Sequence, residues 1–90
     1  MKTAETIVVN ESGLHARPAV LFTRSAAQFT SDIRIRNMTT GSQEVNAKST
    51  MRVLTLAMVK GTCIRLTAEG ADEDEAIQTL IALVDSGLGE

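Results

Sequence analysis

The chain has 90 residues and a mass of 9.6 kDa, so it is expected to form a single domain over residues 1–90, because so short a chain cannot divide into two self-sufficient cores. Hydrophobic residues make up 43% of the sequence and charged residues 22%, which excludes a disordered chain. The net charge of −2 and the two phenylalanines, the only aromatic residues, argue against nucleic-acid binding, because that function needs basic surfaces and aromatic rings for stacking.

The first residues favour neither a signal peptide nor a membrane anchor. Glu5 stands where a signal peptide needs its apolar stretch, and no apolar run approaches the roughly 20 residues that cross a bilayer. The single cysteine, Cys63, excludes an internal disulfide framework and is typical of a reducing compartment. We therefore expect a cytoplasmic, monomeric domain.

The first predicted elements are a strand over Glu5–Val9 and a helix from Ala16 to about Phe29. Odd and even positions of the strand are both partly apolar, so which of them faces the core stays open. In the helix, apolar residues recur at spacings of three and four, and Pro18 stands near the start, where the helix does not use the missing N–H. The shared helical face holds Ala19, Phe22, Ala26 and Phe29.

The middle of the chain predicts a hairpin and a short helix. Asp32–Arg36 alternates with the period of a half-buried strand, Gly41 marks a turn, and Glu44–Ala47 would supply the partner strand. Ser49 then begins a second helix that runs to about Leu56 and is ended by Lys60-Gly61.

A last strand and helix complete the order β-α-β-β-α-β-α. Thr62–Ala68 alternates again, and the carboxylates of Asp72–Glu75 complement the positive end of a third helix that Gly87 ends. No histidine or glycine-spaced loop accompanies these carboxylates, so no metal site is expected. The buried stripe of this helix is Ile77, Leu80, Ile81 and Val84. We expect an α+β fold, in which three helices cover one face of a four-stranded antiparallel sheet and Arg34 and Arg36 lie on the solvated face.

The motif with the most chemistry surrounds the only histidine and reads Gly13-Leu14-His15-Ala16-Arg17-Pro18-Ala19. His15 falls between a glycine turn and a helix N-terminus, where the amides of Ala16 and Arg17 are free to bind an anion. The Arg17 guanidinium suits phosphate oxygens, and the positive helix end favours a neutral imidazole. Such a nitrogen can accept a phosphoryl group without a metal or other cofactor. The alternative is a structural histidine that caps the helix.

Three blocks of the sequence resemble the HPr family, the histidine-containing phosphocarriers of the bacterial phosphoenolpyruvate-dependent sugar phosphotransferase system. The resemblance covers nearly the whole chain and implies the family's open-faced β-sandwich. The blocks, in order, are the His15 motif, Ala47-Lys48-Ser49-Thr50-Met51, and Lys60-Gly61 with Ala68-Glu69-Gly70-Ala71-Asp72-Glu73.

The resemblance implies a carrier and not an enzyme. Nδ1 of His15 would take a phosphoryl group from phosphorylated enzyme I and pass it to the IIA domains of sugar transporters. Arg17 would steady the phosphate, Pro18 would hold the helix start in place, and Ala16 would support the site.

Further residues of the resemblance concern regulation and docking. Ser49 matches the regulatory serine that HPr kinase/phosphorylase modifies in many bacteria and that links HPr to a catabolite-repression regulator, although capping alone explains a serine at this position. The second helix would present a docking patch for partners. Candidate docking residues are Arg24, Thr50, Met51 and Arg52.

Several positions leave open whether the chain resembles the sugar branch or the nitrogen branch of the family. The hairpin loop over 37–43 is longer than is usual for HPr and closer to the nitrogen-branch paralogue NPr, whereas Lys48-Ser49 looks like the sugar branch. Ala57 stands where glycine is common, and the closing residues 85–90 resemble HPr modules of fusion proteins. The alternatives are therefore an NPr-like carrier, a fusion module, or a regulatory adaptor without phosphohistidine chemistry.

Overall fold

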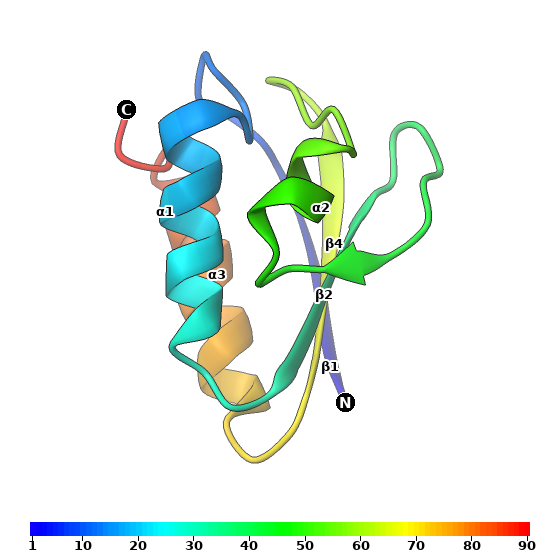
Figure 1. The fold of residues 1–90 in the computed structure, drawn as a ribbon, viewed down its shortest axis with the longest axis vertical. Helices are drawn as coiled ribbons and strands as arrows, with labels where there is room; N and C mark the ends of the chain where they lie inside the picture. Colours follow the sequence, from blue (N-terminus) through cyan, green and yellow to red (C-terminus); the bar gives the residue numbers. More distant parts are fainter.

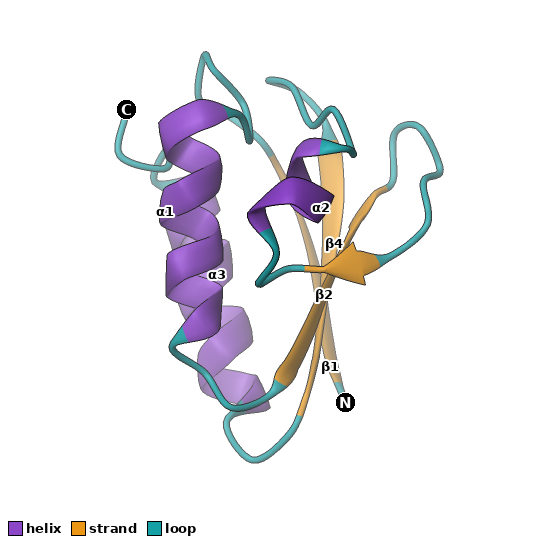
Figure 2. Ribbon diagram, viewed as in Figure 1, coloured by secondary structure: helices purple, strands orange, loops and turns teal.

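The computed structural model describes residues 1–90 and contains four strands and three helices. They are β1 (Lys2–Ile7), α1 (Ala16–Ala27), β2 (Asp32–Asn37), β3 (Val45–Asn46), α2 (Thr50–Leu54), β4 (Cys63–Glu69) and α3 (Glu73–Asp85). The strands form one antiparallel sheet in the order β1-β4-β2-β3. Figures 1 and 2 show the helices on one side of this sheet, so the predicted α+β architecture is confirmed.

The core lies between the sheet and the helices. Ile33 and Ile35 of β2 are fully buried, as is Phe22 of α1 opposite them. In β4 the predicted alternation is confirmed, because Ile64, Leu66 and Ala68 are fully buried whereas Cys63, Arg65 and Thr67 are not. In α3 the expected stripe is buried except for Ile81, which is half-buried.

The first strand lies earlier in the chain than predicted. It pairs with β4 from Lys2↔Ala68 to Ile7↔Cys63, so it begins at Lys2 and ends before Val8. This register settles which face is buried: Val8 is 0% exposed, whereas Ile7 is 46% exposed. The even positions therefore face the core, a choice that only the pairing with β4 could decide.

The short elements are shorter than predicted. β3 has two residues, because only Asn46 and Val45 pair with β2. α2 ends at Leu54 and not at Lys60-Gly61. Three residues later Ala57 has φ +51, a left-handed conformation that a right-handed helix cannot contain. The same φ explains why glycine suits this position.

The hairpin loop between β2 and β3 is anchored by a buried side chain that the sequence pattern did not indicate. Asn37 is 0% exposed. Its Nδ2 donates to the carbonyl oxygen of Leu56 at 2.8 Å, and its Oδ1 accepts from the N–H of Thr40 at 3.1 Å. The long loop is therefore held both at its base and against the segment that follows α2.

Candidate phosphoryl-acceptor site

His15 stands at the N-cap position of α1, with φ −140 and ψ 153, and its side chain makes no capping hydrogen bond. The residue is exposed, and its imidazole takes part in no hydrogen bond or ion pair. The alternative of a histidine that caps the helix through its side chain is therefore wrong. Both ring nitrogens are free for chemistry.

The backbone just before His15 is fixed against the segment that follows α2. Leu14 is 2% exposed, and its N–H donates to the carbonyl oxygen of Met58 at 2.8 Å. Gly13 has φ +66, and a Cβ at this position would lie 2.4 Å from the same carbonyl oxygen. Glycine is therefore required twice, once for its conformation and once for its lack of a side chain.

A second anchor comes from the C-terminal end of the described chain, which lies beside the start of α1 in Figure 1. The Glu90 carboxylate accepts from the Ser12 hydroxyl at 2.7 Å, from the Ser12 N–H at 3.1 Å and from Nδ2 of Asn10 at 3.0 Å. These hydrogen bonds, the Ser12 hydroxyl foremost, lower the pKa of Glu90. Asn10 is buried and its Nδ2 also donates to Gly13 at 2.9 Å, so Glu90 stabilises the loop that carries His15.

The start of α1 offers free hydrogen-bond donors next to the imidazole. The N–H groups of Ala16 and Arg17 have no backbone or side-chain acceptor. The Arg17 side chain is exposed and unpaired, and the first turn holds no acidic residue that would compete with a phosphate. Pro18 is buried against the core and fixes this turn. Free N–H groups and a cationic side chain in this arrangement can bind an anion beside an imidazole nitrogen that is free to react.

Ala16, the residue between His15 and Arg17, carries backbone strain. Its φ is +50, the left-handed conformation, which costs a residue with a Cβ about 1–2 kcal/mol. The fixed residues on either side, Leu14 and Pro18, hold it there. Sequence reasoning did not find this strain, since alanine at a helix start normally takes the helical conformation.

The predicted docking residues form a partly exposed surface over α1 and α2. Met51 is 80% exposed, and Arg24 and Arg52 are exposed and unpaired. Thr50 differs, because it is half-buried and its Oγ1 lies 2.8 Å from Oγ1 of Thr23 on α1. Its contact holds the two helices together. Other exposed apolar residues lie on α1, on α2 and just after α2: Val20, Leu21, Leu54 and Val59.

Ser49 is the N-cap of α2, as predicted, and its Oγ accepts from the N–H of Arg52 at 3.3 Å. It lies at the start of α2, whereas the contact of Met58 with the His15 loop lies beyond the end of that helix. The structure therefore places Ser49 and His15 at opposite ends of α2 and does not bring them into one site.

No helix of the chain combines the length and apolar character that crossing a membrane requires. No three or more His, Cys, Asp or Glu side chains gather where they could hold a metal ion.

Comparisons with known proteins match this geometry. The family model for the PTS HPr component phosphorylation site matches residues 2–86. The phosphocarrier protein HPr of Neisseria meningitidis serogroup A is 42% identical over 83 residues, which are 92% of this chain and 90% of that protein. The crystal structure of HPr-C-His from Thermoanaerobacter tengcongensis is similar with a TM-score of 0.93 and 42% identity, and the match covers 100% of this chain and 98% of that one.

The fold and these matches place the chain in the class of domains that carry a PTS HPr component phosphorylation site. The chain belongs to the HPr family of the phosphotransferase system. Longer relatives contain a similar region. The multiphosphoryl transfer protein of Escherichia coli O157:H7 is 40% identical over 88 residues, 98% of this chain but only 23% of that protein. The chain thus spans about a fifth of the length of the multiphosphoryl transfer proteins that it matches.

Proposed function

We propose that residues 1–90 act as one cytoplasmic phosphocarrier domain, in which Nδ1 of His15 accepts a phosphoryl group from phosphorylated enzyme I and donates it to IIA domains of sugar transporters. The observation that carries this proposal is the unengaged imidazole of His15 beside the free N–H groups of Ala16 and Arg17. A nucleophile and preorganised donors for the transferred phosphate therefore stand together.

The residues present can support the transfer in both directions. The lone pair of the imidazole nitrogen attacks phosphorus while the bond from phosphorus to the donor breaks, and the two amides with the Arg17 guanidinium stabilise the equatorial oxygens. The reverse displacement onto a partner uses the same donors. Neither step requires a residue from deeper in the protein, which agrees with the exposure of His15 and Arg17.

Partners would dock on the surface that surrounds this site. Met51 supplies an adaptable apolar contact, and Arg24 and Arg52 supply the positive charge that steers acidic partners. Thr50 acts indirectly, by holding α2 against Thr23. We further propose that phosphorylation of Ser49 by an HPr kinase/phosphorylase regulates these contacts and recruits a catabolite-repression regulator, because it would add about two negative charges at the start of α2.

The proposal is tested by intact mass after incubation with enzyme I, phosphoenolpyruvate and Mg²⁺. The expected result is one added phosphoryl group that is acid-labile and absent from His15→Ala, whose thermal unfolding should be unchanged because the side chain is exposed and unbonded. Modification of His15→Ala would show that the acceptor lies elsewhere. Absence of modification in the unaltered chain with several enzyme I proteins would favour an adaptor that acts through Ser49.

A second measurement assigns the branch. The phosphorylated chain is mixed with a sugar-specific IIA domain or with the IIA protein of the nitrogen branch, and the transfer rates are compared. Faster transfer to the sugar-specific domain supports the proposal, and faster transfer to the other identifies an NPr-like carrier.

A further inference from the structure

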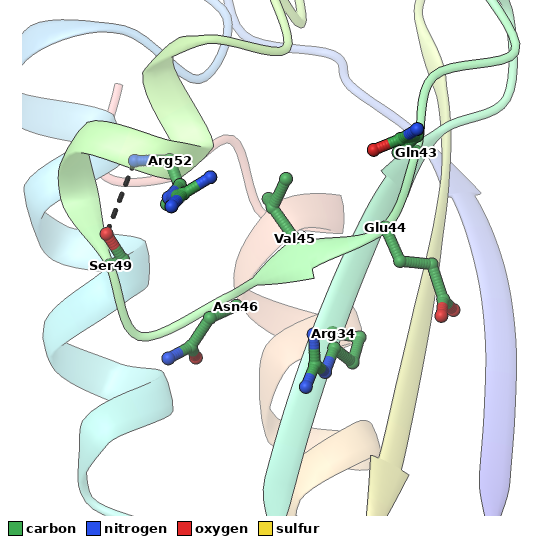
Figure 3. Close-up of a pocket in the computed structure, with 7 residues that line it drawn as sticks. All are labelled: Arg34, Gln43, Glu44, Val45, Asn46, Ser49 and Arg52. Carbon is green, nitrogen blue, oxygen red and sulfur yellow. Dashed lines mark hydrogen bonds between the residues drawn. The ribbon is translucent and has the colours of Figure 1, made fainter.

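A hollow of about 450 Å³ opens where β3 meets the start of α2, away from His15. Figure 3 shows the seven side chains that line it, drawn from β2, the hairpin loop, β3 and α2. They are Arg34, Gln43, Glu44, Val45, Asn46, Ser49 and Arg52. We propose that this hollow is a binding site for a phosphate monoester, with the guanidinium groups of Arg34 and Arg52 as its principal contacts.

Hydrogen bonds inside the protein occupy the acceptor oxygens of two lining residues, Asn46 and Ser49, and leave their donors free. Oδ1 of Asn46 already accepts from the N–H of Lys48 at 3.0 Å, so its Nδ2 donor is the part that remains free. Oγ of Ser49 already accepts from the N–H of Arg52, so its hydroxyl hydrogen is free to be donated. The free groups that Asn46 and Ser49 contribute are therefore donors, which suit an anion with acceptor oxygens, whereas the free acceptors of the lining are on Gln43 and Glu44 of the hairpin loop.

The charged side chains of the hollow also favour an anionic ligand. The Arg52 guanidinium makes no hydrogen bond or ion pair, and Arg34 uses only its Nε, which lies 3.4 Å from Asp32. The terminal nitrogens of both arginines are therefore available for the paired hydrogen bonds that guanidinium groups make with phosphate. Glu44 is the one acidic residue of the lining, and in Figure 3 its carboxylate points away from Ser49 and Arg52.

The shape of the hollow adds a limit on the ligand. Arg52 and Arg34 lie on opposite sides of the short strand β3 in Figure 3, and Val45 is the only hydrophobic residue between them. A small polar molecule with a phosphate group satisfies this lining better than a large apolar one does.

The phosphate can come from two sources. One is a free phosphorylated small molecule, and the other is a phosphoryl group attached to Oγ of Ser49, which itself lines the hollow three residues before Arg52. Residues three apart at a helix start face the same side, so a phosphoserine at position 49 would reach the Arg52 guanidinium. The proposal does not depend on the acceptor role of His15, and a His15→Ala chain would bind in the same way.

The first arm of the test titrates inorganic phosphate into the unmodified chain, against equal ionic strength of chloride, and follows the backbone amide signals of residues 43–46, 49 and 52 by NMR. The same titration is made on Arg34→Gln, Arg52→Gln and the control Arg65→Gln. The Arg65→Gln substitution removes the same charge from the sheet, but Arg65 pairs with Glu5 and does not line the hollow. We expect saturable chemical-shift changes. The affinity for phosphate that they report should be about 10-fold lower in the first two variants and unchanged in the control.

The second arm uses the chain with phosphoserine installed at position 49 and follows its ³¹P signal with pH. A phosphate held by the arginines should titrate below the usual value of about 6 and return toward it in Arg52→Gln. Saturable binding of free phosphate with an unmoved phosphoserine titration assigns the site to a free ligand. A lowered titration without binding of free phosphate assigns it to Ser49. The proposal would be overturned if free phosphate did not bind and the phosphoserine titration was also unmoved. It would be overturned as well if Arg65→Gln reduced binding as much as Arg34→Gln and Arg52→Gln do.

Discussion

The N–H of Leu14 donates to the carbonyl oxygen of Met58 at 2.8 Å, which ties the residue before His15 to the segment that leaves α2. The two segments are far apart in sequence, yet this contact and the packing of Gly13 on the same carbonyl determine where the imidazole stands. The proposed acceptor site therefore depends on packing between distant segments, although the residues proposed to react are close together in the chain.

Replacing Gly13 should damage both stability and transfer. In Gly13→Ala the new methyl group would meet the Met58 carbonyl in a left-handed conformation, so we expect a loss of about 2–4 kcal/mol in the free energy of unfolding and slower phosphoryl acceptance. The matched control is Gly41→Ala, where φ is +72 but nothing lies within 4 Å of the added Cβ. Urea unfolding measures both variants, and equal losses would show that crowding against Met58 is unimportant.

Arg17 should contribute to transfer far more than Arg24, although both are exposed and unpaired arginines of α1. We expect Arg17→Gln to lower the rate of phosphoryl acceptance about 100-fold, because a donor to the transferred phosphate is lost. Arg24→Gln removes the same charge two turns away and should slow docking only a few-fold. Rapid-quench kinetics with enzyme I distinguishes them. Similar rates for the two variants would mean that Arg17 acts only through general attraction.

Ala57→Gly should stabilise the protein. Alanine at φ +51 carries strain that glycine lacks, and after the greater flexibility of glycine in the unfolded chain is subtracted, a gain of about 0.5–1 kcal/mol is expected. The control is Ala82→Gly on the exposed face of α3, which should lose about 1 kcal/mol because its backbone is helical. Chemical denaturation would contradict the assignment of strain if both variants lost stability.

The acid sensitivity of the fold should depend on Asp72. Its carboxylate accepts from the Ser31 hydroxyl and from the N–H groups of Thr30 and Ser31, and these bonds, the hydroxyl foremost, lower its pKa to about 2. The folded pKa lies below the unfolded value of 3.8, so its contribution is full above pH 3.8 and is lost as the pH falls toward 2.

The variant that tests this is Asp72→Asn. It should be less stable than the unaltered chain at neutral pH, and the difference should shrink as the pH falls toward 2, because the protonated carboxyl group and the amide are both uncharged. Urea unfolding at several pH values measures the effect. The control is Asp74→Asn, because Asp74 is exposed and its one ion pair, with an exposed lysine, is long at 3.9 Å. A constant difference across this range would mean that the charge of Asp72 does not matter.

Local patterns in the sequence predicted most of the architecture. The period-two alternation of residues 32–36 and 62–68 identified the central strands and their buried faces, since a strand between a core and water has no other way to separate apolar from polar side chains. In residues 5–9 both faces are partly apolar, so the pattern did not indicate which face is buried. The pairing of Ile7 with Cys63 determines the register and therefore the buried face.

The geometry of the proposed acceptor site was predictable to a similar extent. The motif around His15 predicted a helix that begins just after this residue, and the structure has His15 at the N-cap of α1, beside N–H groups without acceptors. The anchors of the loop could not be predicted, since Asn10 and Glu90 meet across 80 positions of sequence and nothing local to either indicates the other. The strain at Ala16 likewise arises from packing on both sides and not from its own preference.

The five-residue length of α2 has a consequence for how the domain fluctuates. A helix of this length does not persist by itself in water, because nucleation costs more than so few hydrogen bonds return. It is held by buried Val53, by the Thr23–Thr50 contact and by the Ser49 cap. We expect the amide hydrogens of α2 to exchange with solvent faster than those of α1 and β4. The proposed docking surface would then belong to a cooperative unit that opens before the rest of the fold.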